Sequence, residues 1–178
     1  MIQAQPSGMS EETRWYALYT MPQCEKRISL FLSKRKIDYY LPLVPKKRKW
    51  SDRIKVVEFP LFPGYLFIHM PFYQRRLDVL LHPSALRFVQ HEGRPAIIPD
   101  DDIGYLHILV DNAKDLQAHP EENLPEGQKV IVRSGPFKGI RGVVARVKNK
   151  DRIFVKLEHC ALMASAEIDI LDVEKLII

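Results

Sequence analysis

The sequence predicts a mixed α+β fold, in which an antiparallel sheet flanked by helices precedes a small all-β barrel. Up to residue 112, strand-like apolar runs are interspersed with stretches of helical periodicity. From Pro125 onward the pattern changes to short β segments separated by turns. The 178 residues suffice for one medium domain and a smaller one. We therefore expect a disordered lead, a first domain, a linker and a barrel, at residues 1–13, 14–112, 113–124 and 125–178.

The first elements follow from aromatic and amphipathic patterns. Residues 15–19 are aromatic and apolar, which is typical of a buried strand. Residues 25–36 carry apolar side chains on one side and charges on the other, which predicts an amphipathic helix. Strand chemistry returns at 37–44 and ends at Pro45. Residues 46–51 are then expected to form a basic loop.

The middle of the first domain predicts a hairpin and a short helix. Residues 54–59 alternate as a strand, and 65–70 form a second strand after a Pro-Gly turn. We expect these strands to pair, with the basic loop as an exposed tip. Residues 72–81 fit a helix with Leu77, Leu80 and Leu81 on its apolar side.

The first domain is expected to close with two strands and a helix. The strands are predicted at 86–89 and 96–98, joined by a turn at 92–94. The helix at 100–110 begins with three aspartates, which we interpret as capping its positive end. Residues 113–124 lack periodicity and predict the linker.

The C-terminal β segments are expected at 129–133, 142–148, 152–157 and 167–171. Residues 157–166 contain many good helix formers, but their β-branched flanks favour strands at the ends.

The positive charge is concentrated in one block. Residues 26–55 contain eleven Lys or Arg and two acids, whereas the rest of the chain has 16 basic and 20 acidic residues. Such a block attracts a polyanion through counterion release. A solvated helix face followed by a basic loop would give the same composition.

Several functional classes find no support in the sequence. No apolar run approaches the length of a membrane span, and the polar N-terminus does not have the pattern of a secretion signal. The only cysteines are Cys24 and Cys160, so we expect no disulfide framework and a cytoplasmic location. The residues 135–142 lack the Gly-Lys-Ser/Thr ending of a phosphate-binding loop, and the six histidines show no metal-ligand spacing. We therefore predict neither an enzyme nor a cofactor or metal site.

Two stretches carry the functional signal. Residues 60–68 place three aromatic rings on a tight Pro-Gly turn that leads into a strand. Residues 135–144 form a glycine-punctuated hairpin opening. In this order they resemble the NusG-like family of transcription elongation factors, and the second resembles the start of a KOW barrel. The similarity extends from Arg14 to the C-terminus, through the motifs at 15–19, 25–27, 60–67, 87–89, 93–98, 135–144 and 169–176. It implies an NGN-type first domain, a KOW second domain and a monomer that binds RNA polymerase.

The chain also resembles a specialised branch of that family. The residues 50–53 and the Pro-Leu-Phe-Pro run at Pro60 are similar to antiterminators of the UpxY and RfaH kind, which act on selected operons, often for surface polysaccharides. Gly64, however, resembles the general factor. Residues 21–24 carry no charge where relatives often have basic or His residues, which argues against specific DNA readout there.

The resemblance assigns a polymerase-binding surface. Relatives grip the clamp helices of the largest catalytic subunit with positions that correspond to Tyr19, Phe62, Tyr65 and Phe67. Buried aromatic rings contribute strongly to association, but the same rings could fill the core of the domain. For Phe62 and Tyr65, beside the turn, we favour the interface. For Phe67 both readings stand, because strand alternation buries one face.

A nucleic-acid surface follows from the basic block. We expect contacts with phosphates of the displaced non-template DNA strand from Lys26, Arg27, Lys34, Arg35, Lys46, Lys47, Arg48 and Lys49. Arg27 matches a DNA-facing position in relatives. Trp50 either stacks on an unpaired base or folds back onto the domain.

Two further surfaces are implied by the family. Gln74, Arg75 and Arg76 could contact the other large polymerase subunit and hold the clamp closed, or could lie on an ordinary solvated helix face. In the barrel, we expect an apolar and basic surface for either a ribosomal small-subunit protein or Rho, formed by Phe137, Lys138, Ile140 and Arg141. The glycines around those four residues are expected to allow the turns of the barrel.

The prediction is thus an antitermination factor that suppresses pausing or termination on selected operons. Two alternatives are a general elongation factor that couples polymerase to Rho or the ribosome, and a ribosome-associated KOW protein. The aromatic turn argues against the second alternative, because binding ribosomal RNA would not require it.

Overall fold

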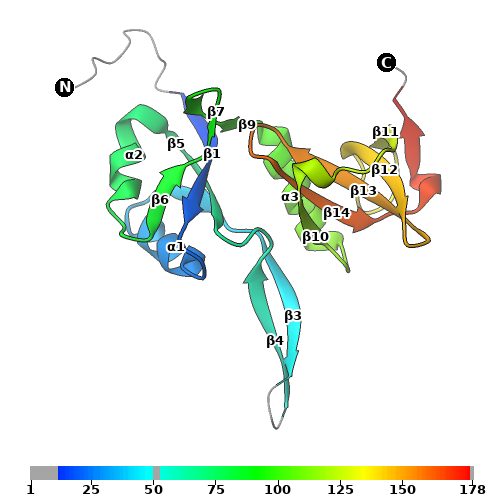
Figure 1. Cartoon of the computed structure of the whole chain (residues 1–178), viewed down its shortest axis with the longest axis horizontal. Coiled ribbons are helices and arrows are strands. Elements are labelled where there is room, and N and C mark those ends of the chain that lie inside the picture. Colours follow the sequence, from blue (N-terminus) through cyan, green and yellow to red (C-terminus); the bar gives the residue numbers. More distant parts are fainter. Residues whose placement is uncertain (1–11, 50–52, 177–178) are drawn as a thin grey trace.

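The computed structural model describes residues 12–49 and 53–176 and confirms the α+β fold class. The N-terminal sheet has the strand order β2-β5-β1-β6, and β9 also pairs with β1 (Figure 1). Every pairing in it is antiparallel. Its strands are β1 (Thr13–Thr20), β2 (Asp38–Tyr40), β5 (Tyr65–Pro71), β6 (Ala85–Phe88) and β9 (Ile97–Ile98).

Helices α1 (Glu25–Lys34) and α2 (Phe72–Leu80) cover one face of this sheet. Alternating strand residues such as Leu18 and Ile68 meet Ile28 and Val79 of the helices in one hydrophobic cluster. The expected apolar side of α2 is wrong, because Leu77, Leu80 and Leu81 are exposed and the helix buries Phe72 and Val79 instead.

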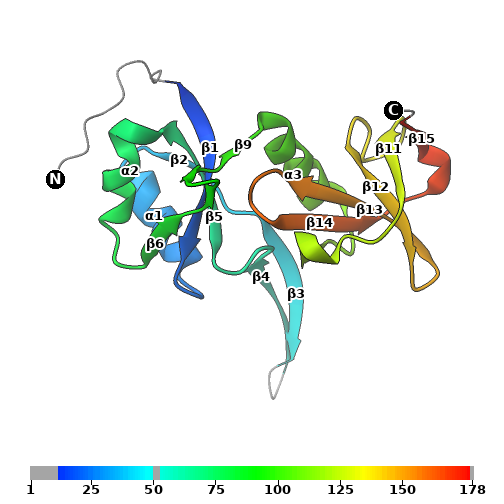
Figure 2. The same cartoon turned by 45° about the horizontal axis from the view of Figure 1, so that its top comes forward.

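Helix α3 (Asp100–Asn112) covers the other face. The imidazole of His107 on α3 stacks on the Tyr40 ring, with ring centroids 3.8 Å apart. In Figures 1 and 2 the helix lies between the N-terminal sheet and the second sheet of the molecule. The short strands β7 (Gln90–His91) and β8 (Arg94–Pro95) pair across the turn predicted at 92–94.

The C-terminal region is all-β and forms a six-stranded sheet in the order β10-β14-β13-β12-β11-β15, with every pairing antiparallel. We call it the C-terminal sheet. Its strands are β10 (Gln117–Pro120), β11 (Gln128–Val132), β12 (Arg141–Val147), β13 (Lys150–Leu157), β14 (Leu162–Glu167) and β15 (Val173–Lys175). The 3-10 turns η1 (Glu121–Asn123) and η2 (Ile170–Asp172) precede β11 and β15.

The C-terminal sheet differs from the expected strand positions in three places. The segment 113–124, expected as a linker, contributes β10, which pairs with β14. The strand predicted at 167–171 is wrong, since β14 ends at Glu167 and a 3-10 turn follows. The helix-forming residues of 157–166 form a turn and then β14, whose side chains from Met163 to Ala166 are buried. Burial and strand pairing therefore outweigh local helix propensity there.

Strands β3 (Leu43–Lys49) and β4 (Ile54–Pro60) form a separate two-stranded ribbon. The ribbon projects from the body of the molecule (Figures 1 and 2). The expected basic loop at 46–51 is therefore wrong for Lys46–Lys49, which belong to β3. The expected hairpin partner is wrong too, because β4 pairs with β3 while β5 lies between β1 and β2 in the sheet.

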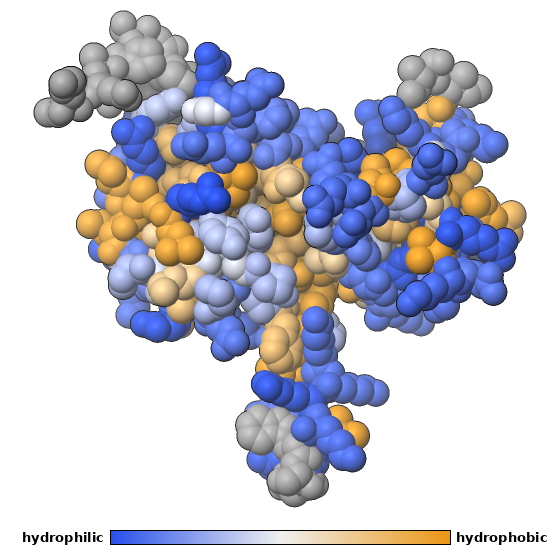
Figure 3. Space-filling view, viewed as in Figure 1, coloured by the Kyte–Doolittle hydropathy of each residue, from blue (hydrophilic) through white to orange (hydrophobic). Residues whose placement is uncertain are grey.

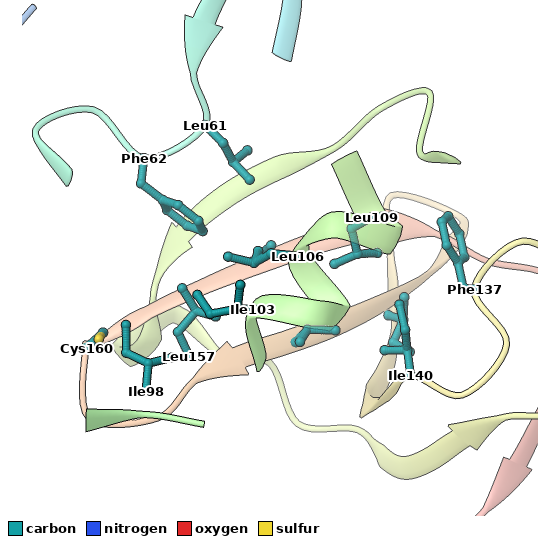
Figure 4. Packing of buried hydrophobic residues seen from close by; sticks show 14 of the residues in the cluster. Leu61, Phe62, Ile98, Ile103, Leu106, Leu109, Phe137, Ile140, Leu157 and Cys160 are labelled. Carbon is teal, nitrogen blue, oxygen red and sulfur yellow. The ribbon is translucent and has the colours of Figure 1, made fainter. Parts of the chain in front are cut away.

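One hydrophobic cluster joins the two sheets through α3. It contains Phe62 and Phe67 from the N-terminal half, Leu106 from α3, and Ile153 and Leu157 from the C-terminal sheet. Figure 4 shows Leu61 and Phe62 pointing toward Leu106, while Phe137 and Ile140 lie near Leu109 at the other end of the helix. Consequently α3 contributes to the hydrophobic cores on both of its sides.

A buried polar network fastens the segment before β10 to the C-terminal sheet. The Arg152 guanidinium donates to the Asp115 carboxylate and to the carbonyl oxygen of Ser165, the latter over 2.9 Å. His119 Nε2 lies 2.8 Å from Ser165 Oγ. Burial by itself raises the pKa of Asp115. The hydrogen bonds from Arg152 and from the Glu167 backbone outweigh this effect and hold the pKa below its ordinary value.

Among the described residues, no helix is long and apolar enough to cross a bilayer.

Candidate functional site

The Pro63-Gly64 turn links the ribbon to β5. The Tyr65 N–H donates to the carbonyl oxygen of Phe62 over 3.1 Å, and Gly64 has a φ of +84°. Proline followed by a residue with positive φ is the pattern of a type II turn, and glycine adopts that conformation without steric cost. The sequence therefore fixes this turn locally.

An aromatic row crosses the sheet next to this turn. Tyr19 is paired with Tyr65 on one side and with Arg87 on the other. The two tyrosine rings meet edge to face with centroids 5.1 Å apart, and the Arg87 guanidinium lies 5.7 Å from the Tyr19 ring centroid. Tyr19 is 37% exposed and Tyr65 is half-buried, and burial raises the pKa of Tyr65 above its ordinary value. We call these three residues the aromatic row.

The other two aromatic residues of the predicted polymerase site are not at the surface. Phe62 is 2% exposed and Phe67 is fully buried, and their rings meet edge to face with centroids 6.1 Å apart. The expectation that Phe62 lies at the interface is therefore wrong, because its ring is in the core. Of the two alternatives for Phe67, the structure shows the one in which its ring fills the core. The physical reason is α3, which covers this face of the N-terminal sheet together with residues of the C-terminal sheet.

The register of the ribbon sorts its charges onto two faces. Cross-strand partners share a face and alternate residues switch it. One face carries Lys46 with Val57 and Arg48 with Lys55. The other carries Lys47 with Val56 and Lys49 with Ile54. The first is the more cationic, and hydrophilic residues cover much of the projecting ribbon in Figure 3.

The basic residues of α1 and its C-terminal end differ in how they relate to the ribbon. Lys26 reaches its base, where the ammonium donates to the carbonyl oxygen of Glu58 over 2.9 Å. Lys34 ends the helix, and the Arg35 guanidinium lies over the Phe31 ring, 3.9 Å from its centroid. Arg27 is exposed. The pKa of His82 lies below its ordinary value, mainly because the imidazole is partly buried and to a smaller extent because of the positive charge of Arg27. Trp50, which is expected either to stack on a base or to fold back onto the domain, lies outside the described residues.

The residues Gln74, Arg75 and Arg76 lie on α2, on the face of the sheet opposite α3. Arg75 is held by a salt bridge to Asp78 and donates to the carbonyl oxygen of Arg35. Arg76 lies 5.5 Å from the Tyr73 ring centroid, and Gln74 is exposed. Hydrophobic residues gather on the surface over this end of the molecule in Figure 3. Leu77 of α2 and Leu81 just after it are exposed.

Only two of the four residues predicted to bind a partner in the C-terminal domain are exposed. Lys138 and Arg141 are exposed, but Phe137 is almost fully buried and Ile140 is fully buried. Both apolar side chains belong to the shared hydrophobic cluster, which is why they are not available to a partner in this arrangement. The turn predicted for Gly139 is present, with a φ of +93°.

Polar contacts join α3 and β7 to the turn between β13 and β14. The Asp102 carboxylate accepts a hydrogen bond of 2.9 Å from the Glu158 backbone N–H, which replaces the capping role we expected. The rings of His91 and His159 have centroids 4.4 Å apart. Burial raises the pKa of the Cys160 thiol to about 12, so this cysteine is a poor nucleophile. Across residues 12–49 and 53–176, no three His, Cys, Asp or Glu side chains gather as metal ligands would.

Two residues beside the turn are not predicted from the sequence, although both stand in motifs that carry the family resemblance. Arg87 pairs with Tyr19, and the Glu25 carboxylate accepts a hydrogen bond from the Gly64 backbone N–H. The usable signal for Arg87 is a basic residue inside the apolar run at 86–89, which is predicted as a strand. Nothing local to Glu25 indicated which group its carboxylate would bind.

Comparisons with known proteins show what the chain and its fold are similar to. The family model described as transcription termination factor nusG matches residues 13–106. The NusG proteins of Thermus thermophilus and Helicobacter pylori, named transcription termination/antitermination proteins, are 30% and 28% identical to the chain. The alignment with the Thermus protein covers 80% of this chain and 86% of that protein. The alignment with the Helicobacter protein covers 92% of this chain and 98% of that protein. A solved structure of Thermotoga maritima NusG, reported for its domain interaction, shares the fold with a TM-score of 0.55, 18% identity and coverage of 93% of this chain and 98% of that one.

Proposed function

The chain belongs to the NusG family of transcription termination and antitermination factors, and we propose that it is a specialised antitermination factor acting on selected operons. Members of this family bind RNA polymerase. The observation that supports polymerase binding by this chain is the aromatic row, a partly exposed Tyr-Tyr-Arg surface beside a projecting cationic ribbon. Such a protein would act as a monomer in the cytoplasm, where the polymerase works.

The aromatic row would dock on the clamp helices of the largest catalytic subunit. The tyrosine rings offer apolar area with few rotatable bonds, and aromatic residues dominate many association energies. The guanidinium of Arg87 can pair with a carboxylate on the partner helices. Because Phe62 and Phe67 are buried here, we restrict the proposed contact to Tyr19, Tyr65 and Arg87.

The ribbon would follow the non-template DNA strand. Lys46, Arg48 and Lys55 share one face, and Lys26 adds a cation at the base. A row of cations that neutralises phosphates releases counterions, so binding would weaken steeply with salt. The more distant Lys34 and Arg35 would contribute little to the same contact.

Two further contacts complete the proposal. Gln74 and Arg76 on α2 would reach the second large polymerase subunit, while Arg75 orders the helix through Asp78. If so, an alanine variant of all three residues should suppress pausing less than the unmodified protein. Lys138 and Arg141 would form the polar part of a surface for a ribosomal small-subunit protein or Rho.

The specialised role rests on the resemblance of residues 50–53 and 60–63 to antiterminators of the UpxY and RfaH kind. A general elongation factor is the second candidate, favoured by Gly64 and by the NusG relatives. Chromatin immunoprecipitation beside the polymerase separates the two. Occupancy on a few long operons, with surface polysaccharide operons first among them, supports the specialised role, and occupancy that follows polymerase everywhere supports the general one.

A double variant, Tyr19→Ala with Tyr65→Ala, tests the docking surface. It removes both rings of the aromatic row, so capture of core RNA polymerase should be abolished while circular dichroism still reports a folded protein. Leu171→Ala is the matched control, because it removes an exposed apolar side chain from η2, away from both the row and α2. Unchanged capture by the double variant would refute the assignment.

A further inference from the structure

Glu25 is a buried carboxylate with a specific partner. Its side chain is 2% exposed although it begins α1, a position where acids usually face solvent. Its Oε1 accepts a hydrogen bond of 2.6 Å from the backbone N–H of Gly64. The N-terminus of α1 favours a negative charge, and Cys24 makes no side-chain cap there. The carboxylate therefore lies between the start of a helix and the Pro63-Gly64 turn.

This hydrogen bond completes the backbone hydrogen bonding of Gly64, a buried residue. The carbonyl oxygen of Gly64 accepts from the Thr20 N–H over 2.8 Å, and its N–H donates to Glu25. Gly64 is itself buried, so without Glu25 its N–H would have no protein acceptor. The turn leads directly into Tyr65, whose ring meets Tyr19. The position of the aromatic row thus depends on how this turn is held.

The next residue of α1 holds the other end of the same segment. The Lys26 ammonium donates to the carbonyl oxygen of Glu58 in β4. Glu58 and Gly64 bound the stretch that passes from the ribbon into the turn. Glu25 and Lys26, which are adjacent in the first turn of α1, therefore bind the Pro63-Gly64 turn and the ribbon, respectively.

We propose that Glu25 is a positioning residue for polymerase binding, which fixes the Pro63-Gly64 turn and with it Tyr65 relative to the ribbon. This inference rests on the proposed docking of the aromatic row. Glu25 touches no partner itself. It acts through the Gly64 backbone, and Lys26 supports it by holding the preceding segment at Glu58.

The test compares Glu25→Ala and Glu25→Gln in the full chain. In Glu25→Ala, the amide of Gly64 should exchange its hydrogen about tenfold faster, because its acceptor is gone, while the amides of β12 and β13 keep their rates. The affinity for core RNA polymerase should fall by about tenfold. Glu25→Gln retains an acceptor oxygen of the same reach and should restore much of both properties. Asp100→Asn is the control, since Asp100 is an exposed acid in the first turn of α3.

The outcomes separate this inference from the proposed function. If the unmodified protein does not bind polymerase, the proposed function fails. If it binds, and Glu25→Ala binds equally well with faster exchange at Gly64, the positioning role alone is refuted. Unchanged exchange at Gly64 also refutes it. Should Glu25→Ala unfold, Glu25→Gln decides, because a folded variant with slow exchange and full affinity supports the role of the acceptor.

Discussion

Asp102 shows how one buried acid can tie stability to pH. Its carboxylate lies in the first turn of α3 and faces the turn between β13 and β14. Burial raises its pKa to about 6, against an ordinary value of 3.8. The folded protein therefore binds this proton more tightly than the unfolded chain does. The stability associated with Asp102 is fully present below pH 3.8 and is lost as the pH rises through about 6.

We expect Asp102→Asn to remove this dependence. The amide is neutral at all pH values and keeps an acceptor oxygen for the Glu158 N–H, so the variant should be more stable at pH 7 by up to about 3 kcal/mol. At pH 4 the gain should largely disappear. Denaturant unfolding at both pH values measures the difference. Asp101→Asn, at the exposed neighbouring position, is the control, and a gain of equal size at both pH values would contradict the assignment.

In the ribbon, the register of strand pairing determines which basic side chains share a face. The sequence shows four consecutive basic residues in 46–49, but pairing with β4 sends them alternately to opposite faces and brings Lys55 beside Arg48. On the opposite face, Lys47 and Lys49 share the surface with Val56 and Ile54. A single DNA strand that lies against one face of the ribbon contacts mainly the cations of that face. Because the Lys46 face collects more cations, it is the expected contact.

Two charge-reversal variants compare the faces directly. Lys46→Glu with Arg48→Glu should weaken DNA crosslinking in the elongation complex and make its salt dependence shallower, because fewer DNA phosphates are neutralised and fewer counterions are released. Lys47→Glu with Lys49→Glu changes the same charge on the other face and should have the smaller effect. The measurement is crosslinking yield over a series of salt concentrations. Equal effects of both variants would mean that total charge matters and the face does not.

At the scale of the whole molecule, α3 makes the two sheets share one core. Ile103, Leu106 and Leu109 of the helix are buried in a cluster that includes Phe62 on one side and Leu157 on the other. The segment after α3 is also fastened to the C-terminal sheet through Asp115 and β10. We therefore expect the two halves to unfold together, although the sequence suggests two domains joined by a linker.

Leu106→Ala tests this coupling. Leu106 is fully buried at the centre of the shared cluster, so its truncation should cost about 2–5 kcal/mol through reduced burial and a cavity. The destabilisation should lower the unfolding midpoints seen by probes in both sheets. Site-resolved unfolding by NMR measures it, with the exposed Leu77→Ala expected to change stability by less than about 0.5 kcal/mol. A shift confined to one sheet would show that the halves unfold independently.

The sequence by itself determined the features that depend on local pattern. Periodicity predicted β1, α1 and α3, the Pro63-Gly64 pair predicted the turn, and composition located the basic block. The sequence motifs by themselves indicate the NusG family, which the comparisons bear out. These predictions succeed because neighbouring residues alone set helix amphipathicity and turn conformation.

Only the tertiary structure decided pairing, burial and the partners of polar groups. β4 pairs with β3, residues 117–120 join the C-terminal sheet, and Phe62, Phe137 and Ile140 are buried by α3 and its neighbours. Glu25 meets a glycine 39 residues away. Such contacts join segments that are distant in the chain. Their free energy depends on which surfaces meet, and no local window of sequence contains that information.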